Sequence, residues 1–83
     1  MIAQPQPADC PLCSAAAERV RAAPRGYRYT CPSCGSFHIS SVALRCRQDI
    51  PASAREDIRR LRAYGYTARI DIDRQHAVRV TPA

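Results

Sequence analysis

The sequence predicts a small α+β domain in which an antiparallel ribbon of about three strands precedes two helices and a C-terminal β-hairpin. Three observations lead to this fold class. Four of the five cysteines form two Cys-x-x-Cys pairs around a segment of alternating apolar residues. After residue 40 the apolar residues recur with a helical period of about 3.6, and after residue 65 they alternate again.

The chain has few large apolar side chains with which to build a core. Its 83 residues include thirteen Ile, Leu and Val residues and one Phe. Apolar burial contributes about 25 cal/mol per Å², whereas ordering each residue costs about 1.5 kcal/mol, and for so lean a chain the sum is near zero. The fold is therefore expected to need a disulfide or a metal ion as an additional staple.

The beginning of the sequence favours a metal ion. Residues 1–9 have no apolar segment of the kind that directs secretion, and no stretch approaches the roughly 18 apolar residues of a membrane span. We therefore expect a cytoplasmic protein without a membrane partner. Thiols stay reduced in that compartment and five is an odd number, so the paired cysteines are interpreted as metal ligands before disulfides.

The spacing of the pairs suits a tetrahedral zinc site. Seventeen residues separate Cys13 from Cys31, enough for a β-hairpin that leaves one cysteine turn and returns at the other. Two residues between cysteines let a tight turn present both sulfurs to one ion. The alternatives are another metal, a cluster, or redox or free thiols, although thioredoxin-like chemistry needs a βαβ setting that this segment lacks.

The segment CPLC…YRYTCPSCGSFHIS, roughly residues 10 to 40, resembles the Cys₄ zinc ribbons of small bacterial and phage proteins. In that family two CPxCG turns, called knuckles, hold zinc at one end of a small antiparallel sheet. Gly35 follows the second pair, where the chain needs a positive φ, whereas Ser14 stands where the first knuckle would also prefer glycine. The resemblance implies one Zn²⁺ with four ligands: Cys10, Cys13, Cys31 and Cys34.

A zinc with four cysteine ligands has no open position for water or substrate, so its expected role is structural. Its binding would contribute folding free energy on the order of 10 kcal/mol. The chain also shows no nucleophile and base at recognisable spacing and no Gly-rich phosphate loop. We therefore predict that the protein is not an enzyme and takes no small-molecule substrate, with redox chemistry of the cysteine pairs as the one competing hypothesis.

The predicted organisation is a flexible N-terminal arm followed by a single zinc-stabilised domain. The arm covers residues 1–8, and the domain covers residues 9–83. Within it, the strands of the ribbon are ERVRAA, YRYT and SFHIS, with PRG as the first turn. The predicted segments are the zinc ribbon (9–40), two helices (41–65) and the β-hairpin (66–81), whose apolar faces cover one side of the ribbon.

Both helices show start and stop signals. Ser40 or Ser41 can cap a first helix that runs to about Asp49 and is stopped by Pro51. The second helix begins with a capping box, Ser53 with Glu56, and ends at Gly65. Its buried stripe is predicted to be Ala54, Ile58 and Leu61. In the hairpin, Tyr66, Ala68, Ile70 and Ile72 share a face that Val78 and Val80 meet from the return strand.

The remaining metal-ligating side chains are interpreted as structural. Cys46 is predicted to share a buried helix face with Val42 and Ile50, with a substitute ligand or redox site as the alternative. His38 follows Cys34 by a ligand-like four residues, but in a strand it would point outward between inward Phe37 and Ile39. A second metal site on the hairpin is disfavoured for three residues on its wet side and turn: Asp71, Asp73 and His76.

Thirteen arginines, with no lysine, give the chain a net charge of +6, which one Zn²⁺ held by four thiolates would lower to about +4. Strand parity predicts Val20, Ala22, Tyr27 and Tyr29 on one ribbon face and Arg19, Arg21 and Arg28 on the other, with Arg25 at the tip. The second helix carries a stripe of Arg55, Arg59 and Arg62, and Arg60 is expected to pair with Glu56. Solvated element faces, or an arginine excess from GC-rich coding, are the alternatives.

These arginines suggest what the protein contacts. The first hypothesis is a non-catalytic zinc-ribbon protein that binds nucleic acid, or the protein machinery that handles it, through its arginine faces. The two helices and hairpin also resemble part of a winged helix-turn-helix, but a third helix and base-reading Asn or Gln side chains are missing. The second hypothesis is a protein-interaction adaptor, or a small phage or mobile-element inhibitor, that meets an acidic protein surface or blocks a nucleic-acid-binding groove.

Overall fold

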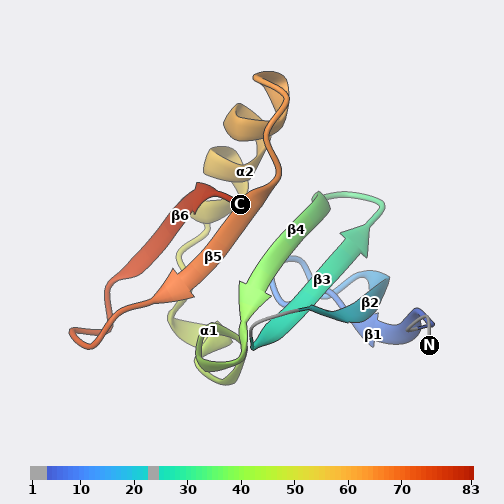
Figure 1. Ribbon diagram of the computed structural model, residues 1–83, viewed down its shortest axis with the longest axis horizontal. Coiled ribbons are helices and arrows are strands. Elements are labelled where there is room, and N and C mark those ends of the chain that lie inside the picture. The colour runs from blue at the N-terminus through green and yellow to red at the C-terminus, as the bar shows by residue number, and fades with distance from the viewer. Residues whose placement is uncertain (1–3, 23–24) are drawn as a thin grey trace.

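A computed structural model describes residues 4–22 and 25–83. All six of its strands form one sheet, in the order β1-β2-β3-β4-β5-β6, and every neighbouring pair is antiparallel except β4 and β5 (Figure 1). The predicted α+β class is therefore correct, but the strand count and order differ from the expectation. In chain order the elements are β1 (Gln6–Asp9), β2 (Ala16–Ala22), β3 (Gly26–Cys31), β4 (Gly35–Ser40), α1 (Ser41–Arg45), a 3₁₀ turn (Arg47–Asp49), α2 (Ser53–Ala63), β5 (Ala68–Ile72) and β6 (Val78–Pro82).

The ribbon has four strands rather than about three, because part of the expected arm is a strand. β1 pairs with β2 from Gln6 opposite Arg19 to Asp9 opposite Ala16. The prediction of a flexible arm over residues 1–8 was wrong for residues 6–8, and residues 1–3 lie outside the described part. Pro5 and Pro7 concealed the strand, since proline weakens a strand pattern, yet proline is tolerated in an edge strand such as β1.

The C-terminal hairpin extends the ribbon sheet instead of covering it. β5 lies parallel to β4, with Phe37 opposite Ala68 and Ile39 opposite Ile70. Parallel neighbours need a long crossover connection, and α1, the 3₁₀ turn and α2 provide it. Both helices pack on the face of the sheet that carries these four buried residues, so the core lies between the helices and strands β3 to β6.

The predicted faces of the β2–β3 hairpin were wrong by one residue of register. Residues directly opposite one another in a sheet share a face, so a slip of one moves every side chain to the other side. The turn that decides the register includes Ala23 and Pro24, which lie outside the described residues. The observed pairs put Arg19 and Arg21 on the face of the tyrosines and Val20 on the face of Arg28: Arg19↔Tyr29, Val20↔Arg28, Arg21↔Tyr27 and Ala22↔Gly26.

The first helix starts as predicted but is shorter. The hydroxyl Oγ of Ser40 accepts a hydrogen bond from the Ala43 amide at 3.1 Å, which is the predicted cap. The helix ends at Arg45, so Val42, Cys46 and Ile50 do not share one helical face. Cys46 and Ile50 pack against the core, whereas Val42 is half exposed.

The second helix ends as predicted but does not begin with a capping box. Its N-cap is Ala52, in a helical conformation and with no side-chain hydrogen bond. At the other end the amides of Gly65 and Tyr66 donate to the carbonyls of Arg62 and Leu61, the paired bonds of a Schellman motif. Within the described ranges no helix has the length and apolar character that crossing a membrane requires.

Candidate metal centre

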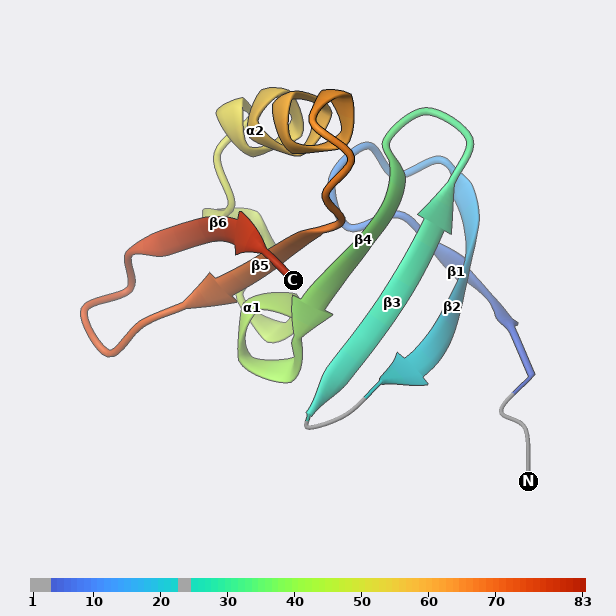
Figure 2. The same cartoon turned by 45° about the horizontal axis from the view of Figure 1, so that its top comes forward.

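The sheet topology brings the two cysteine turns together. The first turn joins β1 to β2, and the second joins β3 to β4. Because these four strands are antiparallel in sequence order, both turns lie at the same end of the sheet, opposite the end occupied by α1 (Figure 2). Cysteines separated by up to 24 positions in the sequence therefore meet as a direct result of strand pairing.

Each turn is closed by a residue with positive φ that follows its second cysteine. Ser14 has φ 63° and Gly35 has φ 82°. The first turn is further held by amides of Ser14 and Cys10, which donate to the carbonyls of Cys10 and Ala15 at 2.9 Å. The two knuckles thus share a left-handed residue after the second cysteine, although serine adopts this conformation rarely and glycine adopts it readily.

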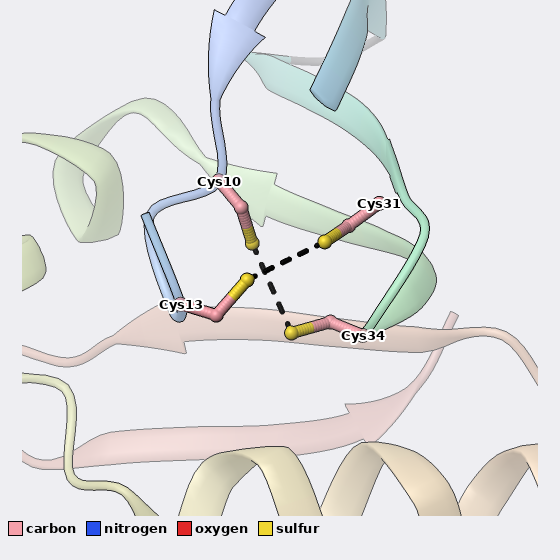
Figure 3. Close-up of side chains that lie close together, drawn as sticks. All are labelled: Cys10, Cys13, Cys31 and Cys34. Atoms are coloured by element: carbon pink, nitrogen blue, oxygen red, sulfur yellow. Dashed lines mark hydrogen bonds between the residues drawn. The ribbon is translucent and has the colours of Figure 1, made fainter. Parts of the chain in front are cut away.

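The four cysteine sulfurs point toward a common centre, two from each knuckle (Figure 3). The Sγ atoms of Cys10 and Cys34 are 3.9 Å apart, those of Cys13 and Cys31 are 3.5 Å apart, and all four lie within 4.8 Å of one another. A tetrahedron with metal–sulfur bonds of about 2.3 Å has edges of about 3.8 Å. The sulfur arrangement therefore fits a single tetrahedral thiolate-bound metal ion, and none of these cysteines is in a disulfide.

The protein environment shifts the pKa values of three of these thiols in different directions. Burial raises the pKa of Cys10 to about 12 and also raises the pKa of Cys34. Burial acts in the same direction on Cys31, but hydrogen bonds from the amides of Cys34 and Ser33 and from the thiols of Cys13 and Cys10 outweigh it and lower the pKa of Cys31 to about 7. A bound cation would offset the cost of burying negatively charged thiolates and so favour their deprotonation.

Arg62 lies against the second knuckle, a placement that was not predicted. Its Nη1 donates to the carbonyl of Cys34 at 3.4 Å, and its guanidinium occupies the space where a side chain at position 35 would project. The cation therefore sits beside a centre whose four thiolates and one divalent metal would carry a net negative charge. Arg62 follows Ile58 by one helical turn, which was the available sequence signal for an inward position.

The metal centre is continuous with the hydrophobic core. Cys10, Cys31 and Cys34 are buried in the same cluster as Tyr29 and Phe37, whose rings stack with centroids 5.6 Å apart. A site enclosed by core side chains, with four cysteine ligands, has the character of structural rather than catalytic metal sites.

The other candidate ligands lie away from this cluster. His38 is on the opposite face of β4 from buried Phe37 and Ile39, as predicted. In the hairpin, Asp71 accepts hydrogen bonds from the Ser40 hydroxyl and the Ile72 amide, both at 2.8 Å. Asp73 accepts from the amides of Gln75 and Ala77, and Arg79 lies 3.3 Å from it, so this carboxylate closes the turn next to His76.

The seven predicted partner-binding arginines fall into different environments. Arg19 packs 4.3 Å above the Tyr27 ring and donates to the Tyr29 hydroxyl at 3.2 Å, so this partly buried side chain is engaged by the tyrosines of its own sheet face. Arg62 is engaged by the knuckle, and Arg60 pairs with Asp57 at 3.6 Å instead of with Glu56. All seven are exposed or partly exposed, and five of them make neither of these contacts: Arg21, Arg25, Arg28, Arg55 and Arg59.

Comparisons with protein-family models, curated proteins and solved structures found no match to this chain.

Proposed function

We propose that this protein is a non-catalytic binding module, held in shape by one structural Zn²⁺, that contacts nucleic acid or the machinery handling it through arginine side chains. The observation that carries the proposal is that the candidate metal centre and the exposed positive charge lie in different parts of the molecule. The cysteine centre is buried and closed, whereas positive charge is spread over exposed positions on both the ribbon and α2. Zinc is the metal that prefers a closed tetrahedron of four thiolates.

Charge supports nucleic acid as the partner. Thirteen Arg residues outnumber seven acidic residues, and among the described side chains only Arg60 and Arg79 are in ion pairs. Arginine forks bind phosphate oxygens with two parallel hydrogen bonds. Such contacts attract a phosphate backbone irrespective of base sequence.

Salt dependence tests this proposal. We expect the zinc-loaded protein to bind labelled oligonucleotides with an affinity that falls on a log–log plot against salt, with a slope near −0.9 per phosphate neutralised on a duplex and about −0.7 on a single strand. Fluorescence anisotropy over a salt series measures the slope. A slope near zero, or no binding at low salt, would refute direct nucleic-acid binding.

A second candidate function is an adaptor or inhibitor that binds a protein. The observation in its favour is a pair of exposed aromatic side chains at the end of α2, Tyr64 at 75% and Tyr66 at 55% exposure. Tyrosine is enriched in protein interfaces because it offers apolar area with a polar tip. This exposure also corrects the prediction that Tyr66 shares the buried face of β5.

Affinity capture separates the two candidates. Tagged protein is purified from its source cells with and without nuclease treatment, and a Tyr64→Ala/Tyr66→Ala variant is processed in parallel. A single protein partner that resists nuclease and is lost with the tyrosines supports the adaptor. Recovery of nucleic acid that nuclease removes, unaffected by the tyrosines, supports the first proposal.

A further inference from the structure

The face of the sheet opposite the helices carries a row of two arginine side chains with a histidine between them. The strand register places Arg28 opposite His38, and His38 opposite Arg69, on three adjacent strands. The proximity of these residues is also evident in His38, whose pKa is lowered by burial and then by the charges of Arg28 and Arg69. Arg69 was not among the predicted contact residues, because its place beside β4 depends on the parallel pairing.

Next to this row the sheet surface is hollowed. The residues opposite one another in the neighbouring row are small, namely Ala22, Gly26 and Ser40. Gly26 must lack a side chain, since a Cβ atom there would collide with the carbonyl of Ile39. Arg25, His38 and Arg69 contribute to the lining of the resulting hollow, so three nitrogen-bearing side chains surround a floor of small residues.

The carboxylates on the same face leave these arginines free. Asp71 lies beside Ser40, where its Oδ1 already accepts two hydrogen bonds, from the Ser40 hydroxyl and its neighbour's amide. Glu18 faces Thr30, one row nearer the metal centre, and Asp9 lies at the end of β1. Within the described residues no carboxylate comes within ion-pair distance of Arg25, Arg28 or Arg69.

We propose that this helix-free face, with Arg25, Arg28, His38 and Arg69, is the surface that binds the phosphate backbone of nucleic acid. The inference rests on the proposed function and adds its location. Three arginines without acidic partners complement a polyanion, and Arg25 and Arg69 flank a shallow hollow over which a backbone phosphate could be held by both guanidinium groups. The arginine stripe of α2 lies on a different element, and one of its members, Arg62, is held by the knuckle.

The test compares two variants that remove the same charge. Arg28→Gln/Arg69→Gln alters the proposed surface, and Arg55→Gln/Arg59→Gln alters α2. Native mass spectrometry first confirms that both retain one metal ion. Binding to a fluorescein-labelled single strand of about 20 nucleotides is then measured over about 50–200 mM salt, where three phosphate contacts give a slope near −2.

The proposal expects the sheet variant to lose at least about tenfold in affinity and to flatten the slope by roughly 1.4, while the α2 variant stays within about threefold of the parent. Loss in the α2 variant alone, or equal loss in both, overturns this location but leaves the proposed function standing. Failure of the parent protein to bind at low salt overturns the proposed function as well.

Discussion

The ribbon, β1 to β4, and the C-terminal part, α1 to β6, contribute to one core by different means. Among the described residues each part supplies six buried apolar or cysteine side chains. In the ribbon three of the six are metal-site cysteines, whereas the C-terminal six are all alanine or isoleucine. Cysteines that could hold a metal ion thus make up half of the ribbon's buried side chains, so we expect its stability to depend on a bound metal far more directly than that of the C-terminal part.

The largest expected effect comes from removing a ligand. In Cys10→Ser a buried thiolate is lost, so the chain should no longer hold its metal, which contributes on the order of 10 kcal/mol in small zinc modules. We expect the amide signals of β1 to β4 to collapse toward random-coil positions in NMR spectra. Cys46→Ser is the matched control, because Cys46 lies outside the cluster. That control should retain one metal ion and cost no more than about 1 kcal/mol.

A smaller effect is expected from the C-terminal core. Ile58, on the inner face of α2, is completely buried, and truncation to alanine should lower the free energy of unfolding by about 2–4 kcal/mol. The metal stoichiometry should stay at one, because Ile58 is not a member of the cysteine cluster. Chemical denaturation with parallel metal analysis measures both quantities. Loss of metal in Ile58→Ala at temperatures where the fold persists would show that the two parts do not differ as described.

The two knuckles provide a finer comparison. Gly35→Ala forces a side chain into a left-handed conformation and against the Arg62 guanidinium, so it should cost about 1–3 kcal/mol and weaken metal retention. Ser14→Gly relieves the same backbone conformation and should be neutral or stabilising by up to about 1 kcal/mol. Competition with a chelator ranks the three proteins. The guanidinium is the end of a flexible side chain and can move aside, so adding Arg62→Ala to Gly35→Ala should recover little of the loss, and full recovery would contradict the left-handed backbone as its main cause.

The smallest effect concerns His38 on the open face. Burial and the neighbouring arginines lower its pKa, so the unfolded chain binds this proton more tightly than the folded protein. Its stabilising contribution is complete above about pH 6.5 and is lost as pH falls through the lower folded value. The free energy of unfolding of the parent minus that of His38→Gln should therefore become smaller, or more negative, on going from about pH 7.5 to about pH 5. A parent that gains stability relative to the variant toward acid would reverse the assigned sign.

The sequence predicted the cysteine cluster, the outward His38 and the end of α2, because each depends on a short local pattern. It could not predict the register of β2 with β3, since one residue in the turn decides which face Arg19 occupies. The parallel pairing of β4 with β5, and with it the Arg28–His38–Arg69 row, depends on contacts between distant segments. The contact of Arg62 with the second knuckle was missed for a similar reason. A helical pattern identifies which face of α2 turns inward, but not which segment of the ribbon that face contacts.

The most direct test is to remove the metal from protein purified from its source cells. Native mass spectrometry should show one zinc ion per chain before chelation. After chelation, heteronuclear NMR should show the ribbon amides, those of β1 and β2 foremost, losing their dispersion, and restoring zinc should bring them back. A metal-free protein that keeps the dispersed spectrum of the loaded form would contradict the account.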